Sequence, residues 1–242
     1  MDEKQLARKE ALARRDALAS DLRAQKSAQV CEELELLVNE WFGEDGARDG
    51  DRPGNCCLAD GTRDDASGVR LAGDARTAAP VVADEPRHVA VYAAIRSELD
   101  LGVFVGAAYA RGWDVCFPCM VRDDCGSPSG EPHMAFVSVS RETLRNDPPA
   151  FVTHPVRSWT MLQLADAGFS VIAPARLDAV VVPLVGFDAD GMRLGYGGGN
   201  YDRFLPHVRS DALIVGVAFA EQQLAHVPTE LHDQPLPRIL SA

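Results

Sequence analysis

A glycine-rich stretch late in the chain gathers the residues best suited to chemistry. It reads RLGYGGGNYDRFL over residues 193–205, and its four glycines stand among arginines, tyrosines and an aspartate. Glycines let a ligand approach the backbone closely, and exposed N–H groups that lead into a helix favour phosphate. Arg193 adds a fixed positive charge, and Asp202 offers a carboxylate that could hold Mg²⁺ against phosphate oxygens. The stretch is therefore interpreted as a cradle for a nucleotide triphosphate.

Spacing excludes two familiar phosphate-binding loops. The sequence contains no G-x-x-x-x-G-K-[ST] segment. The dinucleotide pattern G-x-G-x-x-G also fails, because Asn200 stands where a third glycine is required after Gly195 and Gly197. A flexible turn is the alternative for any glycine run, and the charged and aromatic residues at these offsets weigh against it.

A basic stripe near the amino terminus could supply further cations. Residues 2–24 have the composition of a helix, on which Lys4, Arg8 and Arg15 fall on one side at about 100° per residue. The alternative is a solvated basic face. A second helix is expected near 28–42.

The remaining pattern alternates strands with helices. Strands are expected at 88–95, 114–117, 134–140, 178–187 and 212–219, with helices at 97–112 and 158–167. This alternation predicts an α/β protein with a three-layer, Rossmann-like fold and a mainly parallel central sheet, whose ligands lie beyond the carboxyl ends of the strands. Asn200 is expected to cap a short helix that runs through Leu205.

Length and charge limit the organisation and the partners. We expect the 242 residues to form a single domain, 1–242, in which the glycine-rich segment 43–87 is a flexible insertion. A net charge of −12 disfavours binding to nucleic acid or to anionic membranes. No apolar run approaches the roughly 20 residues of a membrane span, and the charged amino terminus is not typical of a secretory signal. We expect a cytoplasmic protein, monomeric or weakly dimeric.

Two cysteines have C-x-x-C spacing. Cys116 and Cys119 lie in WDVCFPCM, an apolar run that indicates a buried strand. Structural thiols are the expected outcome, and redox chemistry or half a zinc site is the alternative.

The segment DADGMRLGYGGGNYDRFL closely resembles the signature of 5-formyltetrahydrofolate cyclo-ligases (5,10-methenyltetrahydrofolate synthetases). AVYAAIRSELD, DAVVVPLVGFDADG and VAFAEQQLAHVPTELHD resemble further blocks of that family. The resemblance covers roughly 1–42 and 88–237. It implies that ATP phosphorylates the formyl oxygen of 5-formyltetrahydrofolate, that N10 then closes the ring of 5,10-methenyltetrahydrofolate, and that ADP and phosphate are released.

The resemblance also implies roles for particular residues, with ATP and Mg²⁺ as cofactors and a reduced formyl folate as substrate. Nucleotide binding is implied for Lys4, Arg8, Arg193, Leu194, Gly195, Tyr196, Gly197, Gly198 and Gly199, substrate binding for Ala93, Glu98 and Tyr201, metal binding for Asp202 and Asp233, and catalysis for Arg193, Tyr201 and Asp202. Glu98 would accept hydrogen bonds from the pterin, and its alternative role is to stabilise a helix amino terminus.

Two positions depart from the family pattern. Asn200 replaces the first of two consecutive tyrosines, and Ala173 stands in the place of a glutamate. These departures keep open a non-catalytic folate- or nucleotide-binding regulator on the same fold. An enzyme that handles phosphosugars or acyl-CoA is a third possibility, which the set of Arg193, Asp202 and Asp233 disfavours.

Overall fold

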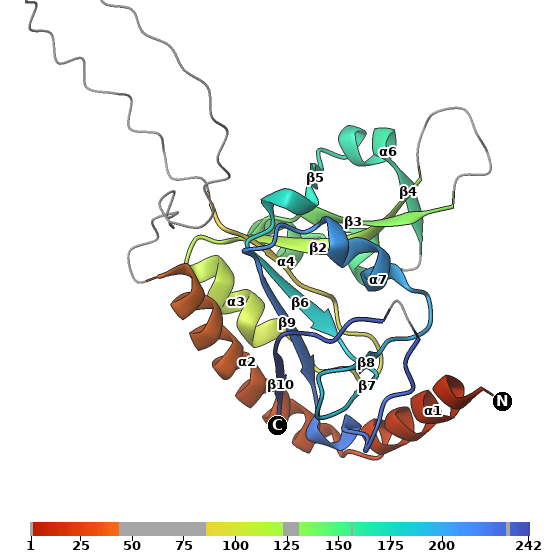
Figure 1. Ribbon diagram of the computed structural model, residues 1–242. Helices are drawn as coiled ribbons and strands as arrows, with labels where there is room; N and C mark the ends of the chain where they lie inside the picture. The colour runs from red at the N-terminus through yellow and green to blue at the C-terminus, as the bar shows by residue number, and fades with distance from the viewer. Residues whose placement is uncertain (1, 44–85, 123–130, 156, 231–232) are drawn as a thin grey trace, which may run out of the picture.

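The structure is a computed structural model, and it describes residues 2–43, 86–122, 131–155, 157–230 and 233–242 (Figure 1). Most of the predicted insertion at 43–87 lies outside the described residues. Within the described part, no helix is long and apolar enough to cross a membrane.

A mainly parallel sheet forms the centre of the described chain, as predicted. Its strands follow the order β10-β9-β6-β1-β2-β3-β5, and β4 pairs with the far end of β2. Only β3 runs antiparallel to its neighbours β2 and β5. The strands are β1 (His88–Ala90), β2 (Asp114–Arg122), β3 (His133–Ser138), β4 (Ser158–Thr160), β5 (Val171–Ile172), β6 (Ala179–Pro183), β9 (Leu213–Ala218) and β10 (Ile239–Ser241), and a separate hairpin pairs β7 (Gly186–Phe187) with β8 (Arg193–Leu194).

Helices cover both faces of the sheet, which confirms the three-layer α/β fold (Figure 1). On one face, Leu34 and Phe104 belong to the same buried cluster as Val181 of the sheet. On the other face, Phe204 packs with Phe136 at a ring separation of 4.9 Å. The helical segments are α1 (Glu3–Asp16), α2 (Ser20–Phe42), α3 (Gly102–Ala110), α4 (Arg141–Asn146), α5 (Ala150–Thr153), α6 (Met161–Asp166), α7 (Asn200–Phe204), and the 3₁₀ turns η1 (Pro174–Arg176), η2 (Leu205–His207) and η3 (Ala220–Gln222).

The amino-terminal helix is shorter than predicted. The expected single helix over 2–24 is two helices, and α2 begins at Ser20 instead of near residue 28. Ala19 is extended, with φ −63° and ψ 149°. The break lets α2 pack along the sheet while α1 lies beneath the β7–β8 hairpin, where Ala11 is fully buried (Figure 1). The composition favours a helix through the break, but packing of α1 and α2 against different parts of the protein outweighs this preference.

Several strand predictions also had wrong limits. The run 178–187 divides after Pro183 into β6 and β7, and the run 88–95 is a strand only from His88 to Ala90. The strand expected at 114–117 continues to Arg122, where β2 also pairs with β4. The helix predicted over 158–167 begins with β4 and becomes helical only at Met161. Pairing with distant strands sets these limits, and the periodicity of a local sequence carries no information about that pairing.

A buried glutamine holds the end of β6 in place. Gln222 is 1% exposed. Its amide donates to Leu184 O at 2.7 Å and to Val185 O at 2.9 Å, and its oxygen accepts from Phe219 N at 2.9 Å. These bonds satisfy three main-chain groups just where the sheet gives way to the hairpin.

We expect Gln222→Ala to lower the free energy of unfolding by about 3 kcal/mol, because it leaves those three buried backbone groups unpaired. Urea denaturation followed by circular dichroism measures the change. Gln223→Ala is the matched control, since its side chain is exposed, and it should change stability by less than about 0.5 kcal/mol. Equal stability of the two variants would contradict the role given to Gln222.

Candidate functional site

A cavity of about 390 Å³ lies beyond the carboxyl end of β6. Segments far apart in the sequence meet there: the start of α1, the loop after β8, the start of α7, and the residues Glu230 and Asp233. The structure brings every predicted nucleotide-binding and metal-binding residue to its wall. The described lining residues are Asp2, Lys4, Arg8, Met134, Val182, Pro183, Arg193, Leu194, Gly195, Tyr196, Gly197, Gly198, Gly199, Asn200, Tyr201, Asp202, Glu230 and Asp233.

The glycine loop presents bare backbone to this cavity. Gly197 has φ +97° and Gly199 has φ +63°, conformations that side chains disfavour. A Cβ atom on Gly199 would lie 2.9 Å from Arg203 Nη1. Within the described residues, no backbone N–H from Gly195 to Gly199 donates a hydrogen bond to another protein group. The loop therefore offers free donors to a ligand.

The start of α7 differs from the prediction. Gly199 occupies the N-cap position without any side-chain cap, so Asn200 is the first helical residue and not the cap. The Asn200 side chain instead accepts from Arg203 Nη2 at 2.9 Å, and the same nitrogen donates to Gly198 O at 2.7 Å. Since α7 has only five residues, its dipole is small. Anion binding here depends mainly on loop amides and on cations.

Three predicted cations surround the loop. Lys4 Nζ lies 2.6 Å from Asp233 Oδ2 and 3.0 Å from Glu230 Oε2. Burial alone would lower the pKa of Lys4, but its hydrogen bonds to these carboxylates raise it above the ordinary value. Arg8 Nε donates to Gly195 O at 2.9 Å. Arg193, whose side chain is 10% exposed, donates to Gln234 O at 2.8 Å and pairs with the carboxylate of Asp202.

The basic stripe of α1 is thus not a solvated face. Arg15, three turns after Lys4, is 1% exposed and donates to Tyr196 Oη at 3.0 Å and to Ser97 Oγ at 3.1 Å. Helical spacing placed Arg15 on the same stripe, although the sequence did not give it a separate role. The stripe brings all its charges to one side of the molecule, against the glycine loop and its neighbours.

Each predicted metal-binding carboxylate is paired with a cation. Asp202, with a side chain 43% exposed, pairs with Arg193, and Asp233 pairs with Lys4 and also accepts from Glu230 N at 2.8 Å. Within the described part of the chain, neither belongs to a group of three close metal-binding side chains. The two carboxylates alone could provide the one or two protein ligands that Mg²⁺ takes when phosphate supplies the others.

The predicted substrate-binding residues divide into two groups. Tyr201 lines the cavity, and burial raises its pKa well above the ordinary value, so its hydroxyl stays protonated near neutral pH. Glu98 stands behind the loop, where its Oε1 accepts from Tyr196 Oη at 2.6 Å. The helix after it starts only at Gly102, so the alternative role at a helix amino terminus is wrong. Ala93 is half-buried against the main core and does not line this cavity.

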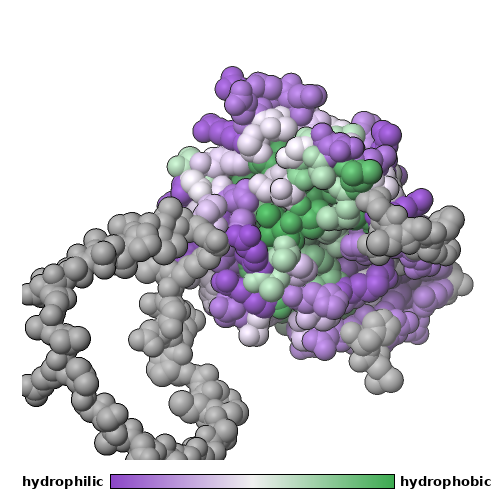
Figure 2. All heavy atoms as spheres, turned by 90° about the horizontal axis from the view of Figure 1, so that it is seen from above, coloured by the Kyte–Doolittle hydropathy of each residue, from purple (hydrophilic) through white to green (hydrophobic). Residues whose placement is uncertain are grey.

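A second, more apolar cavity adjoins the first. It has a volume of about 520 Å³ and shares Met134 and Asn200 with the first cavity. The face that carries α6 and β5 has an apolar strip within a hydrophilic rim (Figure 2). Phe204 and Ile172 contribute apolar wall to the cavity, and Arg203 adds a cation. No local pattern in the sequence indicates this cavity, because its lining comes from three separate segments, 133–135, 171–174 and 200–207.

The C-x-x-C cysteines lie on opposite faces of β2. Residues three apart on a strand point to opposite sides, and Cys116 and Cys119 accordingly belong to different buried clusters. Both are free thiols. Burial raises the pKa of Cys119 to about 12, and burial together with the charges of Asp114 and Asp178 raises the pKa of Cys116 further. A shared redox or zinc site is excluded for this pair, and the structural role is confirmed.

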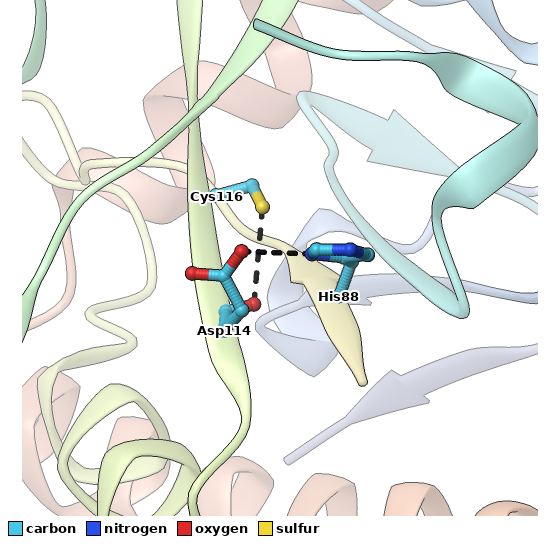
Figure 3. Close-up of side chains that lie close together, drawn as sticks. All are labelled: His88, Asp114 and Cys116. Carbon is cyan, nitrogen blue, oxygen red and sulfur yellow. Dashed lines mark hydrogen bonds and ion pairs between the residues drawn. The ribbon is translucent and has the colours of Figure 1, made fainter. Parts of the chain in front are cut away.

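Cys116 lies in a small polar group near the start of β1 and β2 (Figure 3). The possible ligand atoms of His88, Asp114 and Cys116 lie within 4.8 Å of one another. His88 Nδ1 and Asp114 Oδ2 are 2.7 Å apart, a normal hydrogen-bond distance, and the thiol donates to Asp114 O at 3.8 Å. Asp178 accepts from His88 N at 2.7 Å. We interpret the group as a hydrogen-bonded junction between strands.

Comparisons with known proteins agree with these observations. A family model described as "5-formyltetrahydrofolate cyclo-ligase family" matches residues 74–242. The chain is 46% identical over 72 residues to the 5-formyltetrahydrofolate cyclo-ligase of Haemophilus influenzae, which is 29% of this chain and 38% of that protein. It is 24% identical over 161 residues to the mouse 5-formyltetrahydrofolate cyclo-ligase, which is 64% of this chain and 72% of that protein.

Solved structures share the fold. A 5,10-methenyltetrahydrofolate synthetase from Mycoplasma pneumoniae aligns with a TM-score of 0.61 and 16% identity over 98% of both chains. The Aquifex aeolicus 5,10-methenyltetrahydrofolate synthetase aligns with a TM-score of 0.56 and 22% identity, covering 98% of this chain and 89% of that one. The sequence match to the Haemophilus protein spans less than half of its length, so that match supports relationship and not the whole activity.

We expect Cys116 and Cys119 to resist alkylation by iodoacetamide at mildly alkaline pH in the native protein, because thiolate is the reactive form and burial disfavours it. Both should react after unfolding in urea. Mass spectrometry of proteolytic peptides assigns the label to each cysteine. Rapid labelling of either residue in the native state would contradict the structural role.

Proposed function

The chain belongs to the 5-formyltetrahydrofolate cyclo-ligase family, and we propose that it catalyses the ATP- and Mg²⁺-dependent conversion of 5-formyltetrahydrofolate to 5,10-methenyltetrahydrofolate. The observation that carries the proposal is the convergence, in one cavity, of free loop amides, three cations and two carboxylates. This donor set fits a triphosphate with its metal ion.

The phosphates of ATP would lie against the glycine loop. The free N–H groups from Gly195 to Gly199 would donate to phosphate oxygens, and Lys4, Arg8 and Arg193 would offset the negative charge. Two of these cations are now paired with carboxylates. Bound phosphate would take over part of those ion pairs, which leaves the carboxylates available to a metal ion.

Asp202 and Asp233 would hold Mg²⁺ beside the phosphates. Their carboxylate oxygens are the hard ligands that this ion prefers, and both line the same cavity. When bound, Mg²⁺ would neutralise charge on the transferring phosphoryl group.

The folate would occupy the remaining part of the first cavity and extend toward the apolar one. The apolar cavity suits an aromatic ring, and Arg203 at its wall suits a carboxylate. Glu98, which lines neither cavity, would accept hydrogen bonds from the amino-pyrimidine edge of the pterin where the folate reaches past Tyr196. Met134 and Asn200 lie at the junction of the two cavities.

The reaction needs positioning more than a nucleophilic side chain. The formyl oxygen attacks the γ-phosphorus while the bond to ADP breaks, and N10 then attacks the activated carbon, loses its proton and displaces phosphate. Arg193 would stabilise charge on the transferring group. Tyr201, protonated because burial raises its pKa, would act as a hydrogen-bond donor and not as a base.

We expect purified protein to convert 5-formyltetrahydrofolate to the methenyl product only with MgATP, with one ADP formed per product. Product absorbance and a coupled ADP assay measure the two yields. Arg193→Gln and Asp202→Asn should each lower kcat by about 100-fold or more, because each removes charge stabilisation from phosphoryl transfer.

Asp211→Asn is the matched control, because Asp211 has a side chain 68% exposed and pairs with Arg209 outside the cavity. It should keep wild-type kcat. Binding of both substrates without turnover would support the non-catalytic regulator instead. Full activity of Asp202→Asn would remove that residue from the metal site.

A further inference from the structure

Tyr196 links the glycine loop directly to Glu98 and to α1 by hydrogen bonds. Its hydroxyl donates to Glu98 Oε1 at 2.6 Å and accepts from Arg15 Nη1 at 3.0 Å. Because Tyr196 lies between Gly195 and Gly197, this contact fixes the middle of the glycine loop. Any shift of the loop must therefore act on Glu98.

The same helix holds the loop at a second point. Arg8 Nε donates to Gly195 O at 2.9 Å, two turns before Arg15. Arg15 itself is fully buried and also reaches Ser97, the neighbour of Glu98. The glycine loop, α1 and the turn at 95–98 thus form one hydrogen-bonded unit.

Glu98 keeps hydrogen-bonding capacity for a ligand within this unit. An ionised carboxylate accepts about four hydrogen bonds. Tyr196 uses one site on Oε1, and Ile95 N uses one on Oε2 at 2.8 Å. One lone pair remains on each oxygen, which suits the paired N–H donors of an amino-pyrimidine edge.

The surroundings of Glu98 also set its charge. Burial raises its pKa, whereas the hydrogen bonds from Tyr196 and Ile95 and the charge of Arg15 lower it. The net result is a pKa above the ordinary value. The Tyr196 hydroxyl therefore helps to keep this half-buried carboxylate ionised and oriented.

We propose that Tyr196 is a positioning residue that couples nucleotide binding to folate binding, so that each substrate increases the affinity of the other. This inference rests on the proposed function. A nucleotide that orders the glycine loop fixes Tyr196, and Tyr196 orients Glu98 toward the pterin. By linkage, folate held by Glu98 stabilises the loop conformation that receives phosphate.

The experiment compares wild-type protein with Tyr196→Phe by equilibrium titration. A nonhydrolysable ATP analogue with Mg²⁺ is titrated with and without 5-formyltetrahydrofolate, and the folate is titrated with and without the analogue. We expect each ligand to tighten the other about tenfold in the wild type, and the variant to bring that factor close to one. Phenylalanine keeps the ring and removes only the hydroxyl.

Tyr109→Phe is the matched control. Its hydroxyl also makes one short hydrogen bond, to Val139 O at 2.6 Å, but Tyr109 lies on α3 outside both cavities. The control should keep the wild-type coupling factor. It thereby separates loss of coupling from the general cost of a lost hydroxyl.

A pH series gives a second readout that general destabilisation would not reproduce. The titratable and charged groups around Glu98 are Arg15, Tyr196, Tyr92 and Tyr201. Removing the Tyr196 hydroxyl removes a bond that lowers the pKa of Glu98. Folate binding, which needs the ionised carboxylate, should weaken in Tyr196→Phe as pH falls, beginning at a higher pH than in the wild type.

The outcomes separate the two proposals. If both ligands bind but wild type and Tyr196→Phe show the same coupling factor, the role of Tyr196 is wrong and the proposed function stands. If the wild type binds both ligands independently, the coupling itself is wrong. If neither ligand binds the wild type, the proposed function fails, and the coupling fails with it.

Discussion

The functional architecture depends on the attachment of α1 to the loop after β8 by charged side chains. Lys4, Arg8 and Arg15 each reach a different part of the site: the carboxylate of Asp233, the loop backbone and the Tyr196 hydroxyl. Buried or half-buried charges need such partners, because an unpaired charge away from water is costly. Two of the cations that hold α1, Lys4 and Arg8, therefore also line the cavity in which an anionic ligand would bind.

The backbone conformation of the loop explains why glycine is needed at two of its positions. Gly197 (φ +97°) and Gly199 (φ +63°) have backbone conformations that residues with side chains rarely adopt, and a Cβ atom on Gly199 would also lie 2.9 Å from Arg203 Nη1. Within the described chain, the N–H groups of the loop remain free because no strand or helix uses them. The hairpin, buried through Leu194, fixes the start of the loop, and the buried Phe204 of α7 fixes its end.

The sequence predicted which residues gather at the first cavity better than it predicted the limits of the helices and strands. The stripe of Lys4, Arg8 and Arg15 was predicted from helical spacing, and the structure places all three on one side even though the helix ends at Asp16. The bond from Tyr196 to Glu98 crosses 98 positions of the chain. No local pattern contains such a contact, and the same holds for the pairing of β4 with β2 and for the second cavity.

Asn200 stands where the family resemblance implies a tyrosine, and it supports the end of the loop by polar contacts. Its amide oxygen binds Arg203, and the same guanidinium nitrogen binds Gly198 O, so a polar contact now supports the loop at its end. A tyrosine side chain has no amide oxygen for this contact, but it would add ring surface at the junction of the two cavities. The exchange leaves Tyr201 as the aromatic residue of this pair and makes Arg203 a support for the loop as well as part of the second cavity wall.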